Sequence, residues 1–252
     1  MFRPRVIPTL LLEDNQLVKT EKFKSPTYVG DPVNAIKVFN DKGVDEIVVL
    51  DITASIEGRK PDIEFISHMC GEAFMPFSYG GGITTVKEIK QLIKGGVEKV
   101  VLNASIQNDL NLVKDAAKEI GSQSIVACVD IKSNWLGKQM VYSHQSGKSL
   151  KIDIVRHIEA LQNAGCGEII LQSVDLDGTM KGYDLNLIEK VSKVCTVPLV
   201  VLGGVGNFSH LEEGIEAGAS AASAGSFFVF HGKHKAVLIT YPTQEELAKL
   251  NS

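Results

Sequence analysis

The sequence alternates eight times between a short apolar run and a longer segment with helical periodicity. The apolar runs are rich in Val and Ile, which favours buried parallel strands joined by crossover helices. We expect strands at 5–11, 46–51, 76–80, 99–103, 124–130, 168–172, 198–202 and 220–224. Because the chain has 252 residues, this pattern predicts an α/β fold of the (β/α)8 barrel type.

The segment 31–43, DPVNAIKVFNDKG, illustrates the expected connecting helices. Val33, Ile36 and Phe39 fall on one helical face. Asp31 is placed to cap the start of the helix, and Gly43 to end it.

The sequence also contains an internal repeat, since an offset of 122 residues pairs Pro76 with Pro198. The same offset aligns Gly43 with Gly165, Glu46 with Glu168, Gly81 and Gly82 with Gly203 and Gly204, and Gly96 with Gly218. We therefore expect one barrel domain over 1–252, built of half-barrels at about 1–121 and 122–252. An open doubly wound sheet is the weaker alternative, because no strand is followed by a GxGxxG dinucleotide fingerprint.

Strands one and five align with an offset of 119, which sets Leu11 opposite Asp130. Active sites of such barrels lie at the carboxyl ends of the strands. Asp130 is therefore a candidate general acid or base, the alternative being a structural carboxylate. Asp51 and Asp177 could act in the same way, although Asp51 could equally bind the backbone of its own loop.

Two glycine-rich segments follow strands at duplicated positions, YGGGI at 79–83 and LGGVGN at 202–207. Backbone N–H groups of such segments can bind an anion. With Asn103 and Ala104 in one half, and Gly225 and Ser226 in the other, they predict sites for a ligand with two phosphates. Lys19, after strand one, could cover a phosphate. The alternative is that these glycines only shape turns.

Four charged residues of alternating sign stand at the starts of strands: Arg5, Glu46, Lys99 and Glu168. Together they would ring the amino-terminal floor of the barrel. Charges at this end usually stabilise the fold or contact water. An inward-pointing set could instead pair across the axis and form a gate.

Composition excludes several classes of function. The net charge of −4 argues against nucleic acid or an anionic membrane as partner. The four cysteines are too widely spaced for a metal site or a disulfide scaffold. We expect no metal and no cofactor. Without a signal peptide or a membrane-spanning apolar segment, the expected location is the cytoplasm.

Five segments carry a family resemblance: DPVNAIKVFNDKGVDEIVVLDITASIEGR, YGGGI, VDIK, GEIILQSVDLDGTMKGYDLNLI and LGGVGN. From about Arg5 to Phe230, the chain resembles HisF, the cyclase subunit of imidazole glycerol phosphate synthase. The resemblance implies a half-duplicated barrel that receives ammonia along its axis from a docked HisH-like glutaminase. It also implies lyase and cyclisation chemistry on a substrate with two phosphates, giving imidazole glycerol phosphate and an aminoimidazole carboxamide ribotide.

Carried onto this sequence, the resemblance assigns roles to matching positions. The floor charges correspond to the ammonia gate, and Glu98 to an acidic contact with the glutaminase. The phosphate-binding positions would be Gly82, Asn103, Ala104, Asp177, Gly178, Gly204, Gly225 and Ser226.

Three departures from the family pattern lie in the expected pocket, and a fourth, at Thr20, lies in the loop after strand one. The family uses two aspartates as acid and base; Asp130 is present, but Leu11 replaces its partner. Gln172, Leu202 and Thr20 replace a small hydroxyl residue, a serine and a glycine respectively. Losing one proton-transfer group costs roughly a factor of 100 to 10,000 in rate.

This pattern resembles the diverged HisF-like branch of surface-polysaccharide pathways. There, barrel and glutaminase are associated with a separate amidotransferase that forms acetamidino sugars. The alternatives are a genuine cyclase of histidine biosynthesis using Asp51 or Glu13 as the acid, and a non-catalytic phosphate-binding scaffold.

Overall fold

Eight parallel strands form a closed barrel in the computed structural model, which describes residues 3–107, 109–232 and 234–251. The outermost residues of the expected 1–252 span lie outside these ranges. β1 pairs with β4 on one side and β12 on the other, and β7 pairs with β10, so the ring closes. The predicted (β/α)8 barrel is confirmed. Its strands are β1 (Arg5–Glu13), β4 (Ile47–Asp51), β5 (Phe77–Gly80), β6 (Lys99–Leu102), β7 (Ile125–Ser133), β10 (Glu168–Ser173), β11 (Leu199–Leu202) and β12 (Ala221–Ala224).

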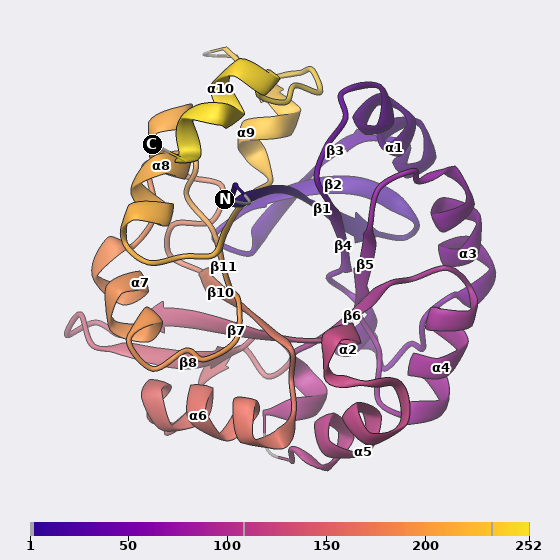
Figure 1. Cartoon of the computed structure of the whole chain (residues 1–252), viewed down its shortest axis with the longest axis vertical. Coiled ribbons are helices and arrows are strands. Elements are labelled where there is room, and N and C mark those ends of the chain that lie inside the picture. The colour runs from indigo at the N-terminus through magenta and orange to yellow at the C-terminus, as the bar shows by residue number, and fades with distance from the viewer. Residues whose placement is uncertain (1–2, 108, 233, 252) are drawn as a thin grey trace.

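Helices surround the barrel on its outside (Figure 1). The Asp31 side chain accepts a hydrogen bond from the Asn34 amide at 2.8 Å, and so caps the first helix as expected. Ile36 and Phe39 of this helix are fully buried. The outer helices are α1 (Pro32–Asp41), α3 (Ile63–Glu72), α4 (Val86–Lys94), α5 (Asn111–Ile120), α6 (Ile154–Ala164), α7 (Leu185–Ser192), α8 (Phe208–Glu216) and α10 (Gln244–Ala248).

Smaller elements are attached to the ring, and most of them lie at the carboxyl ends of the strands. They are β2 (Gln16–Glu21), β3 (Lys24–Gly30), α2 (Ala54–Glu57), η1 (Ala104–Ile106), η2 (Ser122–Ser124), β8 (Gln139–Ser143), β9 (Lys148–Ser149), α9 (Ser226–Val229), β13 (Phe230–His231), β14 (Ala236–Val237) and η3 (Lys249–Asn251). β1 and β7 extend beyond their expected ends at 11 and 130, because each continues into an antiparallel pair with β2 or β8. Leu11 and Asp130 therefore lie within strands rather than at strand ends.

Side chains alternate between the axis and the helices along each strand, because strand geometry has a period of two. Along β1 the inward set begins with Arg5 and continues through Ile7 and Thr9 to Leu11. Inward-facing apolar residues form a cluster separate from the larger core that the helices cover: Ile7, Val48, Val101, Val126, Cys128, Ile170, Val200, Leu202 and Ala221, with Leu50 packed against them. The interior of the barrel is thus a packed apolar layer between two polar ends.

None of the helices in the described part of the chain is long and apolar enough to cross a membrane.

Candidate functional site

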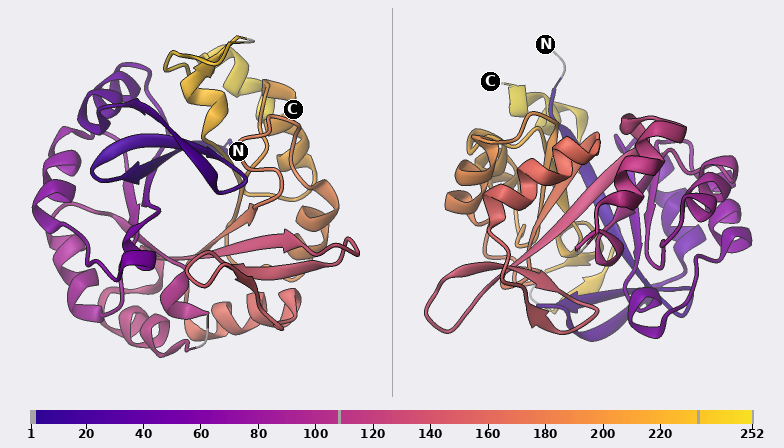
Figure 2. Two further views of the ribbon diagram at one scale, coloured as in Figure 1. Left: turned by 180° about the vertical axis from the view of Figure 1, so that it is seen from behind. Right: turned by 90° about the horizontal axis from the view of Figure 1, so that it is seen from below.

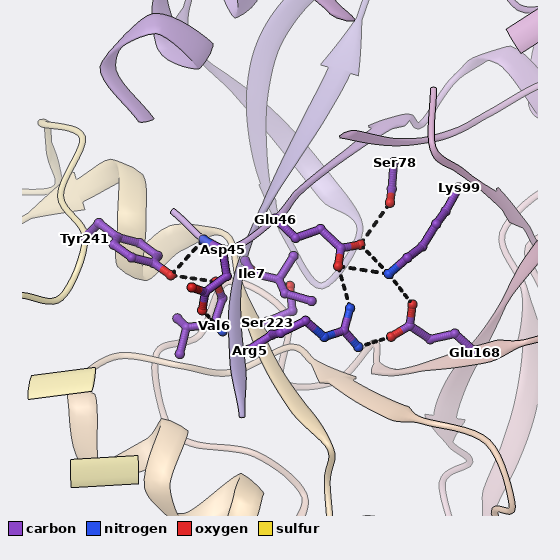
Figure 3. Close-up of polar contacts among 10 residues, drawn as sticks. All are labelled: Arg5, Val6, Ile7, Asp45, Glu46, Ser78, Lys99, Glu168, Ser223 and Tyr241. Atoms are coloured by element: carbon purple, nitrogen blue, oxygen red, sulfur yellow. Dashed lines mark hydrogen bonds and ion pairs between the residues drawn. The ribbon is translucent and has the colours of Figure 1, made fainter. Parts of the chain in front are cut away.

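The floor of the barrel is closed by a ring of ion pairs (Figure 3). The Arg5 guanidinium contacts both Glu46 and Glu168. The Lys99 ammonium lies 2.9 Å from an oxygen of Glu46 and 2.8 Å from one of Glu168. Ser78 donates a further hydrogen bond to Glu46 at 3.0 Å. Each carboxylate is thereby shared by two cations, and all four charges predicted from the sequence meet on the axis.

The two cations of the ring are more exposed than its two carboxylates. The side chains of Glu46 and Glu168 are 4% and 6% exposed, whereas those of Arg5 and Lys99 are 30% and 19% exposed. Burial of Arg5 opposes its charge, but the hydrogen bond to Glu168 and both carboxylates outweigh it and raise its pKa. Arg5 therefore stays charged at neutral pH.

A cavity of about 120 Å³ lies at the opposite end of the barrel. Asp130 and Leu11 both line it, from strands that stand four places apart in the ring. Gln172 lines it too, and is paired with Asp130 in the register of β10 and β7. The structure thus brings the retained aspartate and the leucine predicted to replace its partner to one site.

Asp130 is buried and its charge is poorly compensated. The Asn103 side-chain amide donates to it at 2.9 Å, and the Cys128 thiol lies 3.7 Å from its other oxygen. Burial raises the pKa of Asp130 to about 7, and these hydrogen bonds only partly oppose that effect. A carboxyl group with this pKa can donate or accept a proton near neutral pH.

Asp51 also lines the cavity, but its carboxylate has several partners within its own loop. It accepts hydrogen bonds from the backbone amides of Thr53 at 3.1 Å and Ala54 at 2.9 Å. Arg59 donates to its other oxygen at 3.0 Å. These contacts match the alternative in which Asp51 binds the backbone of its own loop.

The phosphate-binding positions predicted in the first half lie together at the cavity. Gly82, Asn103 and Ala104 all line it, with Ser105 beside them. Gly82 has a φ of 68°, and a β-carbon there would lie 2.3 Å from the Arg59 carbonyl oxygen. Only glycine therefore fits at this position without a backbone shift.

Three of the predicted positions of the second half, Asp177, Gly178 and Gly225, contact the β2–β3 hairpin. The Lys19 ammonium is 3.0 Å from one carboxylate oxygen of Asp177, and the Thr20 hydroxyl donates to the other at 3.2 Å. A β-carbon at Gly225 would lie 3.0 Å from Cε of Lys19, so the lysine stem packs directly on this glycine. Gly178 packs in the same way on the carbonyl of Thr20. The hairpin thus brings a buried cation to this group; the remaining positions, Gly204 and Ser226, are also buried.

Sequence reasoning missed the residues that cover the cavity. Phe23, at the turn of the β2–β3 hairpin, packs edge-on against His144, with ring centroids 5.1 Å apart. Gln145 donates to the Ser55 carbonyl at 2.9 Å, which connects the β8–β9 turn to the short helix α2 that follows β4. Burial lowers the pKa of His144, so its ring is neutral at pH 7. Tyr142 lies between the buried Val141 and Ser143 in β8, and His144 directly follows this strand; this short alternation did not lead to a predicted hairpin over the site.

In the described ranges, no group of three or more His, Cys, Asp or Glu side chains is arranged to hold a metal ion. Asp130, Asp51 and Asp177 each have the protein partners given above.

Comparison with known proteins gives one consistent result. The family model described as "Histidine biosynthesis protein" matches residues 5–235. A Pseudomonas aeruginosa protein described as "Putative imidazole glycerol phosphate synthase subunit hisF2" is 46% identical over 98% of this chain and 99% of its own length. Proteins described as "Imidazole glycerol phosphate synthase subunit HisF" are 38% identical in Exiguobacterium sibiricum, over 90% of this chain and 91% of that protein, and in Thermococcus onnurineus, over 93% and 92%.

Proposed function

The chain belongs to the histidine biosynthesis protein family as a HisF-type barrel, and we propose that it takes ammonia from a glutaminase and delivers it along the barrel axis. The ammonia then serves amidotransfer by a separate sugar-modifying enzyme, because the barrel's own cyclase chemistry is impaired at Leu11. The observation that carries this proposal is the ring of Arg5, Glu46, Lys99 and Glu168 at the floor.

The side chains that line the barrel axis favour passage of a neutral molecule over that of an ion. Above the charged ring, the inward-facing side chains of Ile7, Val48, Val101 and Ile170 are apolar. An ion crossing this layer would lose its hydration without gaining partners, at a cost of several kcal/mol. Ammonia is neutral and small, so it crosses at far lower cost. Movement of Lys99 away from the two glutamates would open the ring.

The glutaminase would dock at the floor. Glu98 is exposed immediately before Lys99, and Phe74, in the loop before β5, is 89% exposed. The Phe74 backbone amide donates to the Asn40 side chain at 2.9 Å, so the aromatic ring sits on an ordered loop. An acidic group and a pre-ordered aromatic anchor are common parts of protein interfaces.

At the mouth, the two groups of phosphate-binding positions would hold a ligand phosphorylated at both ends. Gly82, Asn103 and Ala104 would bind one phosphate, while Asp177, Gly178, Gly204, Gly225 and Ser226 would form the second site. Lys19 would add a positive charge there, oriented by its ion pair with Asp177.

A genuine cyclase is the second candidate, and the pKa of about 7 at Asp130 favours it. Such an enzyme needs a second proton-transfer group. Asp51 is a poor choice, because backbone amides and Arg59 already bind its carboxylate. Leu11, which lies in the cavity wall and is 6% exposed, has no group that could transfer a proton.

Replacing Lys99 by methionine tests the conduit. In a mixture of barrel, glutaminase and acceptor enzyme, we expect Lys99→Met to change the rate of glutamine-dependent transfer at least about 10-fold, because it removes a cation that contacts both glutamates of the ring. Transfer driven by added ammonium should stay unchanged. Lys94→Met, an exposed lysine on α4, is the matched control. If circular dichroism shows that both proteins are folded, and wild type and Lys99→Met give equal glutamine-dependent transfer, the scaffold alternative is favoured instead.

A further inference from the structure

A projecting hairpin presents two large apolar side chains to solvent. β7 and β8 extend past the ring of helices, at the end of the barrel opposite the start of β1 (Figure 2). In the turn between them, Trp135 is 90% exposed and Leu136 is 69% exposed. Adjacent apolar side chains at the tip of such a projection are typical of a protein-binding surface.

The tip is held in one conformation by its own hydrogen bonds. The Asn134 side-chain oxygen accepts from the amides of Leu136 and Lys138, both at 3.0 Å. The Asn134 amide also donates to the Lys138 carbonyl at 2.9 Å. Because this turn is already ordered, burying Trp135 against a partner would cost little backbone entropy.

The base of the hairpin is fixed to the segment that follows β10. The Ser133 amide donates to Asp175 at 2.7 Å, and the Gln139 side chain donates to Asp184 at 2.6 Å. Asp175 and Asp184 flank Asp177, which binds Lys19 at the mouth. The projecting tip is therefore mechanically connected to the mouth rather than being a free loop.

Beside the tip lies a groove of about 630 Å³ with a cationic wall. Lys138, Lys151 and Lys190 line it and are exposed. The carboxylate that also lines it, Asp153, accepts a hydrogen bond from the Arg156 amide as the cap of α6. In a chain with a net charge of −4, three lysines around one groove fit a partner with acidic side chains.

We propose that the Trp135 tip and this lysine-lined groove dock the enzyme that consumes the ammonia. The inference rests on the proposed function: if ammonia enters at the floor and leaves at the mouth, the consumer must cover the mouth end. The glutaminase would occupy the other end, next to Lys99 and Phe74. The partner is expected to offer an apolar pocket for Trp135, with acidic residues at its rim.

Trp135 is the only tryptophan in the chain, so it can carry a single spectroscopic probe. The barrel is labelled with 5-fluorotryptophan and titrated with the acceptor amidotransferase or with the glutaminase. We expect the acceptor to shift or broaden the one fluorine resonance, and the glutaminase to leave it unchanged. No change with the acceptor, or a change with the glutaminase alone, would overturn the proposal.

Affinity measurements complete the test. Trp135→Ala with Leu136→Ser should weaken binding of the immobilised acceptor at least about 30-fold, as for an interface hot spot. Lys151→Glu with Lys190→Glu should also weaken it, and Phe74→Ala should not. Equal affinity of wild type and the Trp135 variant would overturn the proposal, as would a dimer of the barrel alone that Trp135→Ala abolishes. Binding that depends on Trp135 without any glutamine-dependent transfer would leave the docking surface standing and remove the proposed function.

Discussion

At the scale of single residues, the candidate site has one carboxyl group where the resemblance to HisF predicts two. Asp130 is buried beside Asn103 and Cys128 at the mouth. Leu11 lines the same cavity from the opposite side of the ring. The offset between strands one and five was enough to predict this juxtaposition. The raised pKa of Asp130 could not be predicted, because it depends on burial by residues distant in sequence.

Asp130→Asn should stabilise the protein, and more so at pH 8 than at pH 5. Burial raises the pKa of Asp130 from 3.8 to about 7, so between these values the folded chain binds more protons than the unfolded chain. Stability therefore falls as the pH rises from about 4 to 7, and the loss persists above 7. An asparagine side chain does not titrate, so the stability of the variant lacks this dependence on pH. The stabilisation should be larger at pH 8 by about 2 to 3 kcal/mol in urea unfolding. The same difference at both pH values would contradict the assigned pKa.

At the scale of elements, the regular strand and helix pattern was predictable, but the hairpins at the mouth were not. The β2–β3 turn has positive φ angles at Lys22, 53°, and Phe23, 61°. Turns of this kind are usually marked by Asn or Gly, so the sequence carries no ordinary hairpin signal here. The hairpin is held by tertiary contacts instead, including the bond from the Lys22 amide to the Asp177 carbonyl. Lys19, expected in a loop, consequently lies in a strand.

Lys19→Met should weaken binding of a bisphosphate ligand at the mouth. Its ammonium group is paired with Asp177 and its stem packs on Gly225, so the charge would face a phosphate bound at these positions. A hydrogen bond to a charged group contributes about 1.5 to 3 kcal/mol, so titration calorimetry with the family's bisphosphate substrate should give at least about a 10-fold loss of affinity.

Lys22→Met is the matched control, because Lys22 is an exposed lysine of the same hairpin. If both variants lose affinity equally, the effect is one of overall charge and the role given to Lys19 is wrong. Lys19→Arg should retain most of the affinity, which would separate a role in binding from one in folding.

At the scale of the whole molecule, the barrel places a charged floor and a polar mouth at opposite ends of an apolar interior. This arrangement follows from the strand period of two, which carries the inward face from Glu168 through Ile170 to Gln172. From the strand starts alone, pairing of the four charges was one of two alternatives, the other being charges that stabilise the fold or contact water; the resemblance to HisF favoured the pairing. Which residues cover the mouth depends on loop packing, so Phe23, His144 and Gln145 could not be found in advance.

The proposed division between a preserved conduit and impaired cyclase chemistry rests most directly on Leu11. The decisive measurement is the cyclase rate of wild type and Leu11→Asp, with saturating ammonium and the family's bisphosphate substrate. We predict a weak wild-type rate that rises about 100-fold or more when the carboxylate is restored, and that Asp130→Asn then abolishes. A wild-type rate already equal to that of an ordinary cyclase, sensitive to Asp130→Asn and not raised by Leu11→Asp, would contradict this account.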